Sequence, residues 1–528
     1  MTRKLEVSMN ANPMKRARTI MFQGTSSDVG KSLMATALCR ILVQDGCKVA
    51  PFKSQNMSLN SYVTVDGKEI GRAQGMQADA CAIAATTDMN PILLKPSQDM
   101  SSQVVVHGKP FKELDARSYR EEYLPMAETI VKDALARLRA ENDVVVIEGA
   151  GSPAEINLKD RDIVNMRLAL WADAPVILVA DIDRGGVFAS IVGTLDILEP
   201  QERERIKGII INKFRGDVSL LQPGIDWLEE RIGKPVLGVV PYLPNLQLED
   251  EDSASLNAKF IGSRNEGDRT KCVDIAVIRL PRISNFTDID PLLHEPDVLI
   301  RWIDTAFDFG NPDAVILPGS KNTAEDLLFL RKSGIADRLM EHVQHGGSLA
   351  GICGGYQMMG ERLLDPDHVE SGQRELAGLG FFPMETVFTS EKRTVRVKGT
   401  AEGGFLSAPV SINGYEIHMG QSSFTQKIHQ PFRIVKDHFL HEPVYSDGAL
   451  TMNGKVWGTY IHGVMHNDEF RRQWLNKLRG QKGLPIKEKA IAFQDLREKS
   501  FDRLAEHFAK HVDMEKIYSL ITGGVKDE

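Results

Sequence analysis

The stretch Gly24–Ser32, with the sequence GTSSDVGKS, constrains the fold of this chain more than any other stretch. It follows the apolar run 19–22, which predicts a buried strand, and it precedes apolar residues at helical spacing between positions 33 and 42. A strand, a glycine loop and a helix are the layout that binds phosphate groups through backbone N–H groups at the helix start. Lys31 would add a positive charge, and the Ser32 hydroxyl would be a ligand for Mg²⁺. The expected nucleotide-binding residues of this loop are Gly24, Thr25, Asp28, Val29, Gly30, Lys31 and Ser32.

The spacing of the loop departs from the usual pattern, because five residues instead of four separate Gly24 from Gly30. This variant resembles dethiobiotin synthetase and its relatives, which phosphorylate carboxylates. The alternative interpretation is a glycine turn that only precedes a helix.

The composition is that of a globular protein with two or three domains. Apolar residues make up 42% of the 528 residues, and the net charge of -8 gives no reason to expect nucleic-acid binding. The five cysteines are scattered, which argues against a disulfide framework and for a reducing, cytoplasmic compartment. No apolar run approaches the ~20 residues that a membrane span needs. Residues 1–18 are expected to be a flexible tail, and the sequence leaves a homo-oligomer open.

Apolar strands alternate with helical segments over 19–248, which predicts a doubly wound parallel sheet in this first domain. Uninterrupted apolar runs are typical of strands that are covered on both faces. A helix that carries Asp79 is expected over 70–80. The expected strands after the first are 48–52, 143–147, 174–180, 208–213 and 236–241.

Polar residues at the ends of these strands are candidates for chemistry, since ligands bind at the carboxyl ends of strands in such sheets. Lys53 opens the polar run Lys53–Ser61 and would neutralise charge on a transferring phosphoryl group, the alternative being a solvated loop. Glu148 ends a buried strand and is expected to hold Mg²⁺, the alternative being a capping role. Asn212 is expected to read a nucleotide base or to cap a loop.

A polar stretch at 249–271 is the expected linker to a second α/β domain at 272–480. A new series of apolar strands begins after this linker, with strands expected at 273–278 and 313–317. Residues 481–528 are expected to form a helical C-terminal segment.

Cys353 is the expected nucleophile of the second domain. It lies in the sequence GICGG, between an expected strand and an expected helix. The small neighbouring residues allow a strained turn that exposes the sulfur, and a helix start favours the thiolate. The other four cysteines lack such surroundings and are expected in the core or on helices.

Two histidines are candidates for the base that a thiol nucleophile needs. His462 is favoured over His418 because it follows the last expected strand, 456–461. A buried structural histidine is the alternative for either. Backbone N–H groups near Gly319 and Ser320 and after the cysteine would form an oxyanion hole.

Both halves together resemble the cobyric acid synthases, the glutamine-dependent amidotransferases of cobalamin synthesis. The resemblance covers nearly the whole chain outside the tail and the linker. It implies a dethiobiotin-synthetase-like P-loop domain that binds ATP, followed by a class I-like glutamine amidotransferase domain. It is carried by Gly24–Ser32, Lys53–Ser61, Glu148–Ser152, Asp181–Gly186, Ile211–Asp217, Arg282–Asp288, Gly351–Gln357 and Gly458–Gly463.

The resemblance also implies the reaction. ATP, with Mg²⁺, would convert the b, d, e and g side-chain carboxylates of a corrinoid, (adenosyl)cobyrinic acid a,c-diamide, into acyl phosphates. Ammonia released from glutamine would then give (adenosyl)cobyric acid, and Lys53–Ser61 and Arg282–Asp288 are the candidates for contacts with the corrinoid. The alternatives are a cobyrinic acid a,c-diamide synthase, a partitioning-type P-loop ATPase, and a scaffold whose glutaminase half is inactive.

By analogy with the synthetase relatives, Ser32, Asp79 and Glu148 correspond to positions of a Mg²⁺ site. One departure from the glutaminase pattern stands out. Ordinary class I glutaminases have His-x-Glu, whereas Val464 stands two residues after His462. The third member of the triad is therefore absent or comes from another segment, and the sequence assigns none.

Overall fold

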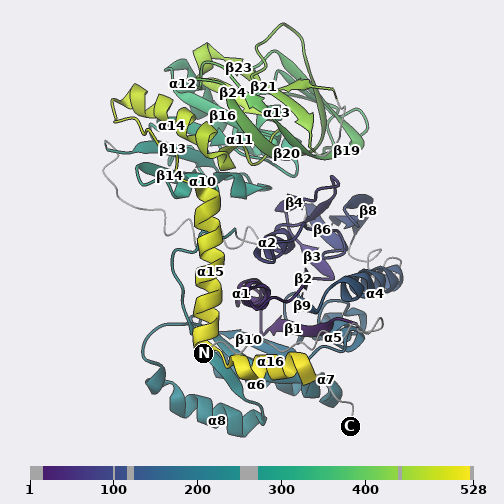
Figure 1. Cartoon of the computed structure of the whole chain (residues 1–528). Coiled ribbons are helices and arrows are strands. Elements are labelled where there is room, and N and C mark those ends of the chain that lie inside the picture. Colours follow the sequence, from purple (N-terminus) through teal and green to yellow (C-terminus); the bar gives the residue numbers. More distant parts are fainter. Residues whose placement is uncertain (1–15, 99–100, 116–123, 250–270, 438–442, 524–528) are drawn as a thin grey trace. The chain divides into compact units, whose positions relative to one another are not determined.

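The computed structural model describes residues 16–98, 101–115, 124–249, 271–437 and 443–523, which form two compact units (Figure 1). The first unit comprises the described residues within Met1–Ser58, Ile70–Glu251 and Leu496–Glu528. The second unit is built from Leu59–Glu69 and Asp252–Asp495. Each unit therefore includes one segment that is distant in sequence from the rest of it.

A six-stranded sheet with the order β12-β11-β10-β1-β9-β2 forms the centre of the first unit, and all of its pairings are parallel. A strand lies at every position that the sequence predicts, so the predicted doubly wound sheet is confirmed. The strands are β1 (Arg18–Gly24), β2 (Val49–Phe52), β9 (Val144–Glu148), β10 (Val176–Asp181), β11 (Ile206–Phe214) and β12 (Val236–Pro241).

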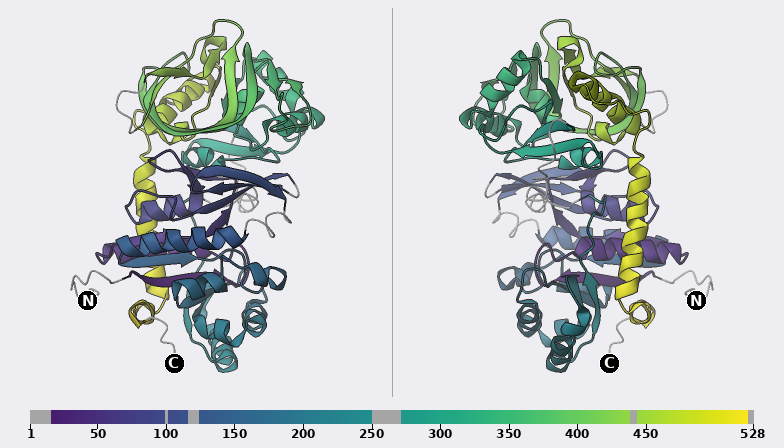
Figure 2. Two further views of the ribbon diagram at one scale, coloured as in Figure 1. Left: turned by 90° about the vertical axis from the view of Figure 1, so that its right-hand side faces the viewer. Right: turned by 90° about the vertical axis from the view of Figure 1, so that its left-hand side faces the viewer.

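Helices cover both faces of this sheet, with α1 and α15 on one side and α4 and α5 on the other (Figures 1 and 2). Ile20 and Phe22 alternate with Met21 along β1 and join the apolar cluster beneath α1, as the two-residue period of a strand requires. The helices are α1 (Lys31–Gln44), α2 (Arg72–Ala80), α4 (Leu124–Glu141), α5 (Met166–Ala172), α6 (Val187–Ile197), α7 (Pro200–Arg205) and α8 (Gln222–Ile232). A smaller sheet beside them contains β3 (Gln55–Met57), β6 (Ile92–Gln98), β7 (Ser101–Val106) and β8 (Lys109–Asp115).

The last helices of the chain, α15 (Phe493–His511) and α16 (Met514–Gly523), complete the core of the first unit. The ring of Phe508 packs edge-on against that of Phe22 on β1, with 6.3 Å between their centroids. The backbone N–H of Asp513 donates to the Leu237 carbonyl oxygen at 2.7 Å, which ties the junction of the two helices to β12. No helix within the described ranges combines the length and the apolar character of a membrane span.

The second unit contains a mostly parallel sheet with the order β14-β13-β15-β16-β24-β23, in which only the pairing of β23 is antiparallel. Its strands are β13 (Val273–Ile278), β14 (Val298–Ile303), β15 (Ala314–Leu317), β16 (Ser348–Ile352), β23 (Ala449–Thr451) and β24 (Val456–Thr459). The helices of this unit are α10 (Asp290–Leu293), α11 (Thr323–Lys332), α12 (Ile335–Gln344), α13 (Gly354–Met358) and α14 (Asp468–Lys482). The predicted second α/β domain is thus confirmed.

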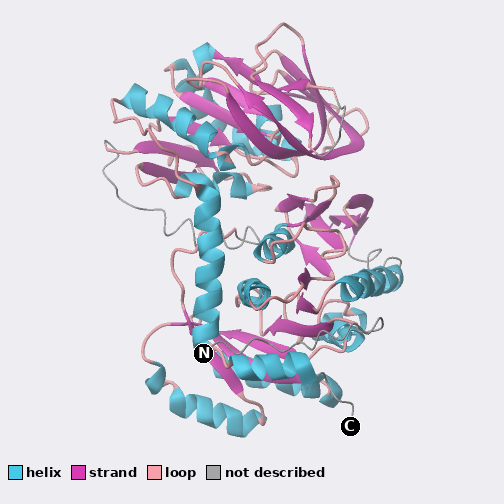
Figure 3. Ribbon diagram, in the orientation of Figure 1, coloured by secondary structure: helices cyan, strands magenta, loops and turns pink. Residues whose placement is uncertain are grey.

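A second sheet in this unit is largely antiparallel and is drawn as the group of long magenta strands in Figure 3. Its strands are β17 (Arg362–Leu364), β18 (Glu375–Ala377), β19 (Met384–Ala401), β20 (Val410–Phe424), β21 (Phe432–Lys436) and β22 (Tyr445–Asp447). A short hairpin of β4 (Ser61–Val63) and β5 (Glu69–Gly71) brings residues 59–69 into the second unit.

Candidate active sites

The loop between β1 and α1 has the backbone geometry that a phosphate cradle requires. Gly24 ends β1, and a Cβ at this position would lie 2.6 Å from a methyl group of Val29, so only glycine fits. The Lys31 side chain curls over the loop, and its Nζ donates to the carbonyl oxygens of Ser26 and Gly151, each at 3.0 Å. The Thr25 N–H donates to β10 at 3.0 Å. Contacts within the protein therefore determine the shape of the loop.

Asn212, at the end of β11, holds this loop from the side. Its Nδ2 donates to the Val29 carbonyl oxygen at 2.8 Å, and a Cβ on Gly30 would lie 2.2 Å from the same nitrogen. The neighbouring Lys213 donates to the Asp28 carbonyl oxygen at 2.6 Å. Of the two roles expected for Asn212, these contacts match the loop-holding one, and base recognition stays a prediction.

Three of the residues that the sequence singles out meet at one buried carboxylate, that of Glu148. Its Oε1 accepts from Ser32 Oγ at 2.9 Å and pairs with Lys53 Nζ at 2.9 Å. Only 1% of Glu148 is exposed, so Lys53 compensates a charge that water does not reach, and Ser32 adds a hydrogen bond. The three residues come from three separate segments, because the ends of parallel strands gather at one edge of the sheet.

Gln77, on α2, is a member of this cluster that the sequence did not indicate. Its Nε2 donates to Glu148 Oε2 at 2.6 Å. Its Oε1 is buried, and no donor in the described part of the chain reaches it. Within the same ranges no three His, Cys, Asp or Glu side chains gather as a metal site. Oxygen ligands here would therefore have to include neutral groups such as Ser32 Oγ and Gln77 Oε1.

Asp79, two residues further along α2, lies in a different cluster. Its Oδ2 accepts from Arg497 Nη2 at 2.8 Å, and Arg497 also pairs with Glu249 at 3.0 Å. Burial by itself would raise the pKa of Glu249, but the charges of Arg497 and Arg72 outweigh it and lower that pKa to about 2. Asp79 therefore has a partner on α15, and its expected role at the Mg²⁺ site stays a prediction.

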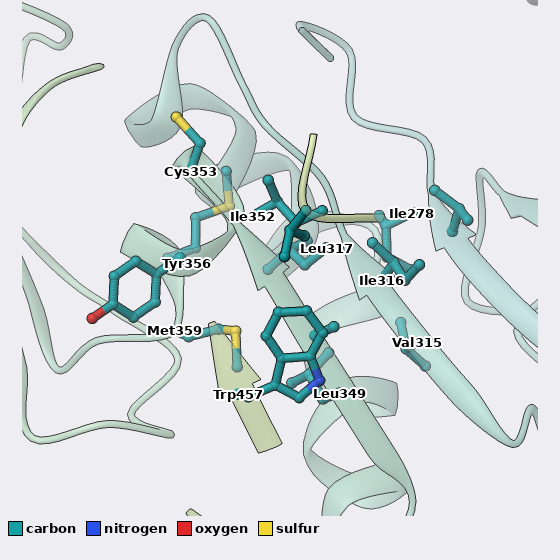
Figure 4. Close-up of a cluster of buried hydrophobic side chains, with 14 of the residues drawn as sticks. Ile278, Val315, Ile316, Leu317, Leu349, Ile352, Cys353, Tyr356, Met359 and Trp457 are labelled. Carbon is teal, nitrogen blue, oxygen red and sulfur yellow. The ribbon is translucent and has the colours of Figure 1, made fainter. Parts of the chain in front are cut away.

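Cys353 stands between β16 and α13 with a φ of 50° and a ψ of -109°, an unusual conformation for a residue with a side chain. A Cβ on Gly355 would lie 2.0 Å from the Leu317 carbonyl oxygen, which explains the glycine that follows the turn. The Cys353 thiol lies 3.6 Å from the Ile417 carbonyl oxygen. Figure 4 shows the sulfur pointing away from the apolar cluster around Trp457. The turn thus places Cys353 at the margin of the buried cluster, with its sulfur turned away from Trp457.

His462 faces this thiol and is held by a carboxylate from far away in the sequence. Its Nδ1 lies 2.7 Å from Asp288 Oδ2, and Asp288 Oδ1 accepts the Gly463 N–H at 2.7 Å. Cys353 is a hydrogen-bond partner of His462 as well. Burial alone would lower the pKa of His462, but Asp288 and Cys353 together raise it to about 10. Because Nδ1 donates to the carboxylate, Nε2 is the nitrogen that can accept the thiol proton.

Asp288 is the residue that the sequence could not assign, since Val464 occupies the usual position of the third triad member. It lies in the 3₁₀ helix η5 (Phe286–Ile289), in the loop that follows β13. The stretch Arg282–Asp288 carries part of the family resemblance and is a candidate for contacts with the corrinoid, but the sequence gives it no role in the triad. Its place after the first strand of the second unit is the signal that could have indicated a site residue.

His418, the other candidate for the base, lies in β20 and differs from His462 in its contacts and in its pKa. Its Nδ1 donates to the Gly420 carbonyl oxygen at 2.7 Å, and its ring stacks on Tyr460 with 3.8 Å between centroids. Burial lowers the pKa of His418 to about 3, which keeps the ring neutral. The geometry therefore favours His462 as the base. Ser320 N lies 2.9 Å from the position that a Cβ on Gly354 would occupy, so the expected oxyanion donors border the thiol turn.

Comparison with known proteins identifies the family of each half of the chain. Residues 20–256 match the family model described as the CobQ/CobB/MinD/ParA nucleotide binding domain, and residues 274–470 match the CobB/CobQ-like glutamine amidotransferase domain. Proteins named cobyric acid synthase are similar over nearly the full length. The one from Geobacillus sp. (strain WCH70) is 53% identical over 505 residues, 96% of this chain and 98% of the relative. The one from Dehalococcoides mccartyi (strain CBDB1) is 51% identical over 516 residues, 97% of this chain and 100% of the relative. The chain therefore belongs to the cobyric acid synthase family of glutamine amidotransferases.

Proposed function

We propose that this protein amidates the b, d, e and g side-chain carboxylates of (adenosyl)cobyrinic acid a,c-diamide, using ATP and the ammonia of glutamine, to give (adenosyl)cobyric acid. The observation that carries the proposal is the arrangement of Cys353, His462 and Asp288 in a chain whose other unit has a phosphate loop beside Glu148. The names of the full-length relatives support the choice of substrate. A cytoplasmic location is part of the proposal, and all five cysteines are free thiols.

In the glutaminase half, His462 Nε2 takes the proton of the Cys353 thiol, and the sulfur attacks the side-chain carboxamide carbon of glutamine. The C–N bond then breaks, and the proton held at Nε2 passes to the leaving nitrogen, which departs as ammonia. Water attacks the remaining thioester, which gives glutamate and returns the thiol. Asp288 acts as a positioning residue, because it fixes the tautomer and the orientation of the imidazole and stabilises its protonated form.

In the synthetase half, the residues present fit a magnesium ion with bound ATP. The test is the buried Gln77 Oε1, an oxygen beside Glu148 that no donor in the described part of the chain reaches. Ser32, Glu148 and Gln77 would hold the ion, which would neutralise phosphate charge. Lys31 would bind phosphate oxygens, and Lys53 would stabilise charge on the transferring phosphoryl group. Ammonia would then displace phosphate from the acyl phosphate of the substrate.

The test is to mix the protein with ATP, Mg²⁺, glutamine and the corrinoid a,c-diamide and to follow product mass. We expect four successive additions of an amide, with Cys353→Ala losing the glutamine-supported rate by about 10⁴-fold or more while retaining the rate with added ammonia. Lys31→Ala should lose both rates but still hydrolyse glutamine. Full glutamine-supported activity in Cys353→Ala would refute the nucleophile. Amidation of cobyrinic acid itself, with none of its a,c-diamide, would favour the a,c-diamide synthase.

A further inference from the structure

The polar run Lys53–Ser61 is divided between the two units. Its first part is held by groups of the first unit: Lys53 pairs with Glu148, and the Ser58 N–H donates to the Leu94 carbonyl oxygen at 3.1 Å. From Leu59 onward the chain belongs to the second unit. Asn60 therefore follows Lys53 by only seven positions, although the two residues lie in different units. A displacement at Lys53 has a short covalent path to Asn60.

The segment 59–69, which we call the insert hairpin, is fixed next to the glutaminase centre. The Ser61 N–H donates to Asn285 Oδ1 at 2.9 Å, and the Phe286 N–H donates to Asn60 Oδ1 at 3.2 Å. The far end of the hairpin is anchored by the ion pair of Glu69 with Lys392 on β19. These contacts are buried, so the position of Asn285 depends on the insert hairpin.

Asn285 connects the insert hairpin to the catalytic base. Its backbone has a φ of 51°, which asparagine tolerates, and it immediately precedes η5 with Asp288. Because Oδ1 accepts from Ser61, the amide is oriented with Nδ2 toward His462 Nε2, at 3.4 Å. An N–H donor in this place favours the neutral imidazole and opposes the proton that the base must accept from the thiol. Apart from Asn285, His462 is faced by Asp288, Cys353 and the neutral His418, and the Tyr415 ring stacks on it.

We propose that the insert hairpin holds the Asn285 amide against Nε2 of His462 and that this contact restrains glutamine hydrolysis until acid substrate, bound at residues 53–58, moves the hairpin. The inference rests on the proposed function of Cys353 and His462. It links the two reactions, because glutamine is then consumed fastest when a carboxylate is ready to be amidated. When the Asn285 amide moves away, Nε2 of His462 can accept the proton of the Cys353 thiol. This step changes the charge of no other residue.

The first test removes the backbone donor that orients Asn285. Ser61→Pro deletes the N–H, and proline is tolerated at the first residue of a strand. Glutamate release is measured with glutamine alone and again with ATP and the corrinoid a,c-diamide. We expect the basal rate to rise about 5-fold, which is the effect of one hydrogen bond. The ratio of the rate with ATP and acid substrate to the basal rate should fall toward one. The control is Lys68→Ala in the same hairpin, where the ammonium pairs with Asp66 at 2.8 Å, and this variant should retain the wild-type rates.

The second test removes the amide itself and has a readout that a merely structural role would not change. Asn285→Gly keeps the positive φ accessible and deletes the side chain. We expect the same rise in basal hydrolysis. The apparent pKa of the alkaline limb in the pH profile of kcat/KM should rise by about 0.5–1 unit, because the protonated imidazole of His462 no longer faces an N–H donor.

Three outcomes would overturn the inference: a wild-type protein without stimulation by acid substrate, a folded Ser61→Pro variant with the basal rate of Lys68→Ala, or an Asn285→Gly variant with an unchanged alkaline limb. Failure of the proposed function is a separate result. In that case Cys353→Ala in the same backgrounds would still release glutamate.

Discussion

The two candidate centres differ in how their buried charges are compensated. In the first unit, the Glu148 carboxylate is neutralised by Lys53, a cation that the proposed chemistry needs for a phosphoryl group. In the second unit, His462 already has its working partners, with Asp288 on Nδ1 and Cys353 on the other side. The proposed chemistry therefore requires Lys53 to exchange Glu148 for phosphate, whereas His462 already contacts the partners that the proposed chemistry gives it.

This contrast indicates which of the two centres would need a restraint on its reaction. A thiol–imidazole pair that stands ready would hydrolyse glutamine without acid substrate, and the proposed restraint would limit that loss. A centre that is incomplete without its ligands needs none, because its chemistry waits for the substrate. The contact of the Asn285 amide with His462, at 3.4 Å, is the restraint that we propose for this centre.

The largest expected effect tests the preassembly of the glutaminase centre. Asp288→Asn should lower kcat/KM for glutamine hydrolysis by about 10²–10⁴-fold, because an amide neither stabilises the imidazolium nor fixes its tautomer. Amidation with added ammonia should be unchanged. Asp304→Asn, at an exposed carboxylate of the same unit, is the control and should retain wild-type hydrolysis. Comparable rates in the two variants would contradict the role of Asp288.

The second prediction compares Gln77 with Asp79 at the nucleotide centre. Gln77→Leu should weaken the binding of Mn²⁺ in the presence of ATP by about 10-fold, and Gln77→Glu should restore it. Electron paramagnetic resonance of the bound Mn²⁺ measures this directly. Asp79→Asn should change Mn²⁺ binding little but lower the free energy of unfolding by about 1–3 kcal/mol, because Arg497 loses a charged partner. A greater loss of Mn²⁺ binding in Asp79→Asn than in Gln77→Leu would support the assignment by resemblance.

The smallest expected effect concerns the second histidine of the glutaminase unit. His418 has a pKa of about 3 in the folded protein, below its ordinary value of 6.5, so at acid pH only the unfolded chain binds the proton. Its contribution therefore lowers stability as the pH falls below 6.5, by about 2 kcal/mol between pH 7 and pH 5. Urea unfolding of wild type and His418→Phe at both pH values checks this. The variant should lose about that much of the pH dependence, and an equal pH dependence would contradict a neutral His418.

Residues that end parallel strands could be predicted from the sequence, because the fold brings such positions together whatever the loops do. Glu148 on β9 and Lys53 after β2 are of this kind, and β2 and β9 are neighbours in the sheet. Cys353 after β16 and His462 after β24 follow the same rule, since those strands pair directly. In both units the apolar runs determined the sheet, and the sheet determined which strand ends meet.

The remaining site residues depend on details that apolar patterns do not contain. Gln77 and Asp79 are two positions apart on one helix, about 200° around its axis, so a small error in the phase of α2 exchanges their surroundings. Asp288 reaches His462 only through the conformation of a loop without a repeating pattern. The return of Leu496–Glu528 to the first unit is a long-range pairing of helices, and amphipathic helices do not specify which core they cover.

The position of Phe508 against Phe22 has a consequence for biosynthesis. A ribosome releases Phe22 long before Phe508, so the apolar surface of β1 and α1 stays uncovered while the intervening chain is made. The glutaminase unit ends at Asp495, so all of its residues have been translated before Phe508. The unit that begins first in the sequence is thus the unit that completes its core last, and a nascent chain that stalls before Phe508 would expose this surface to chaperones and proteases.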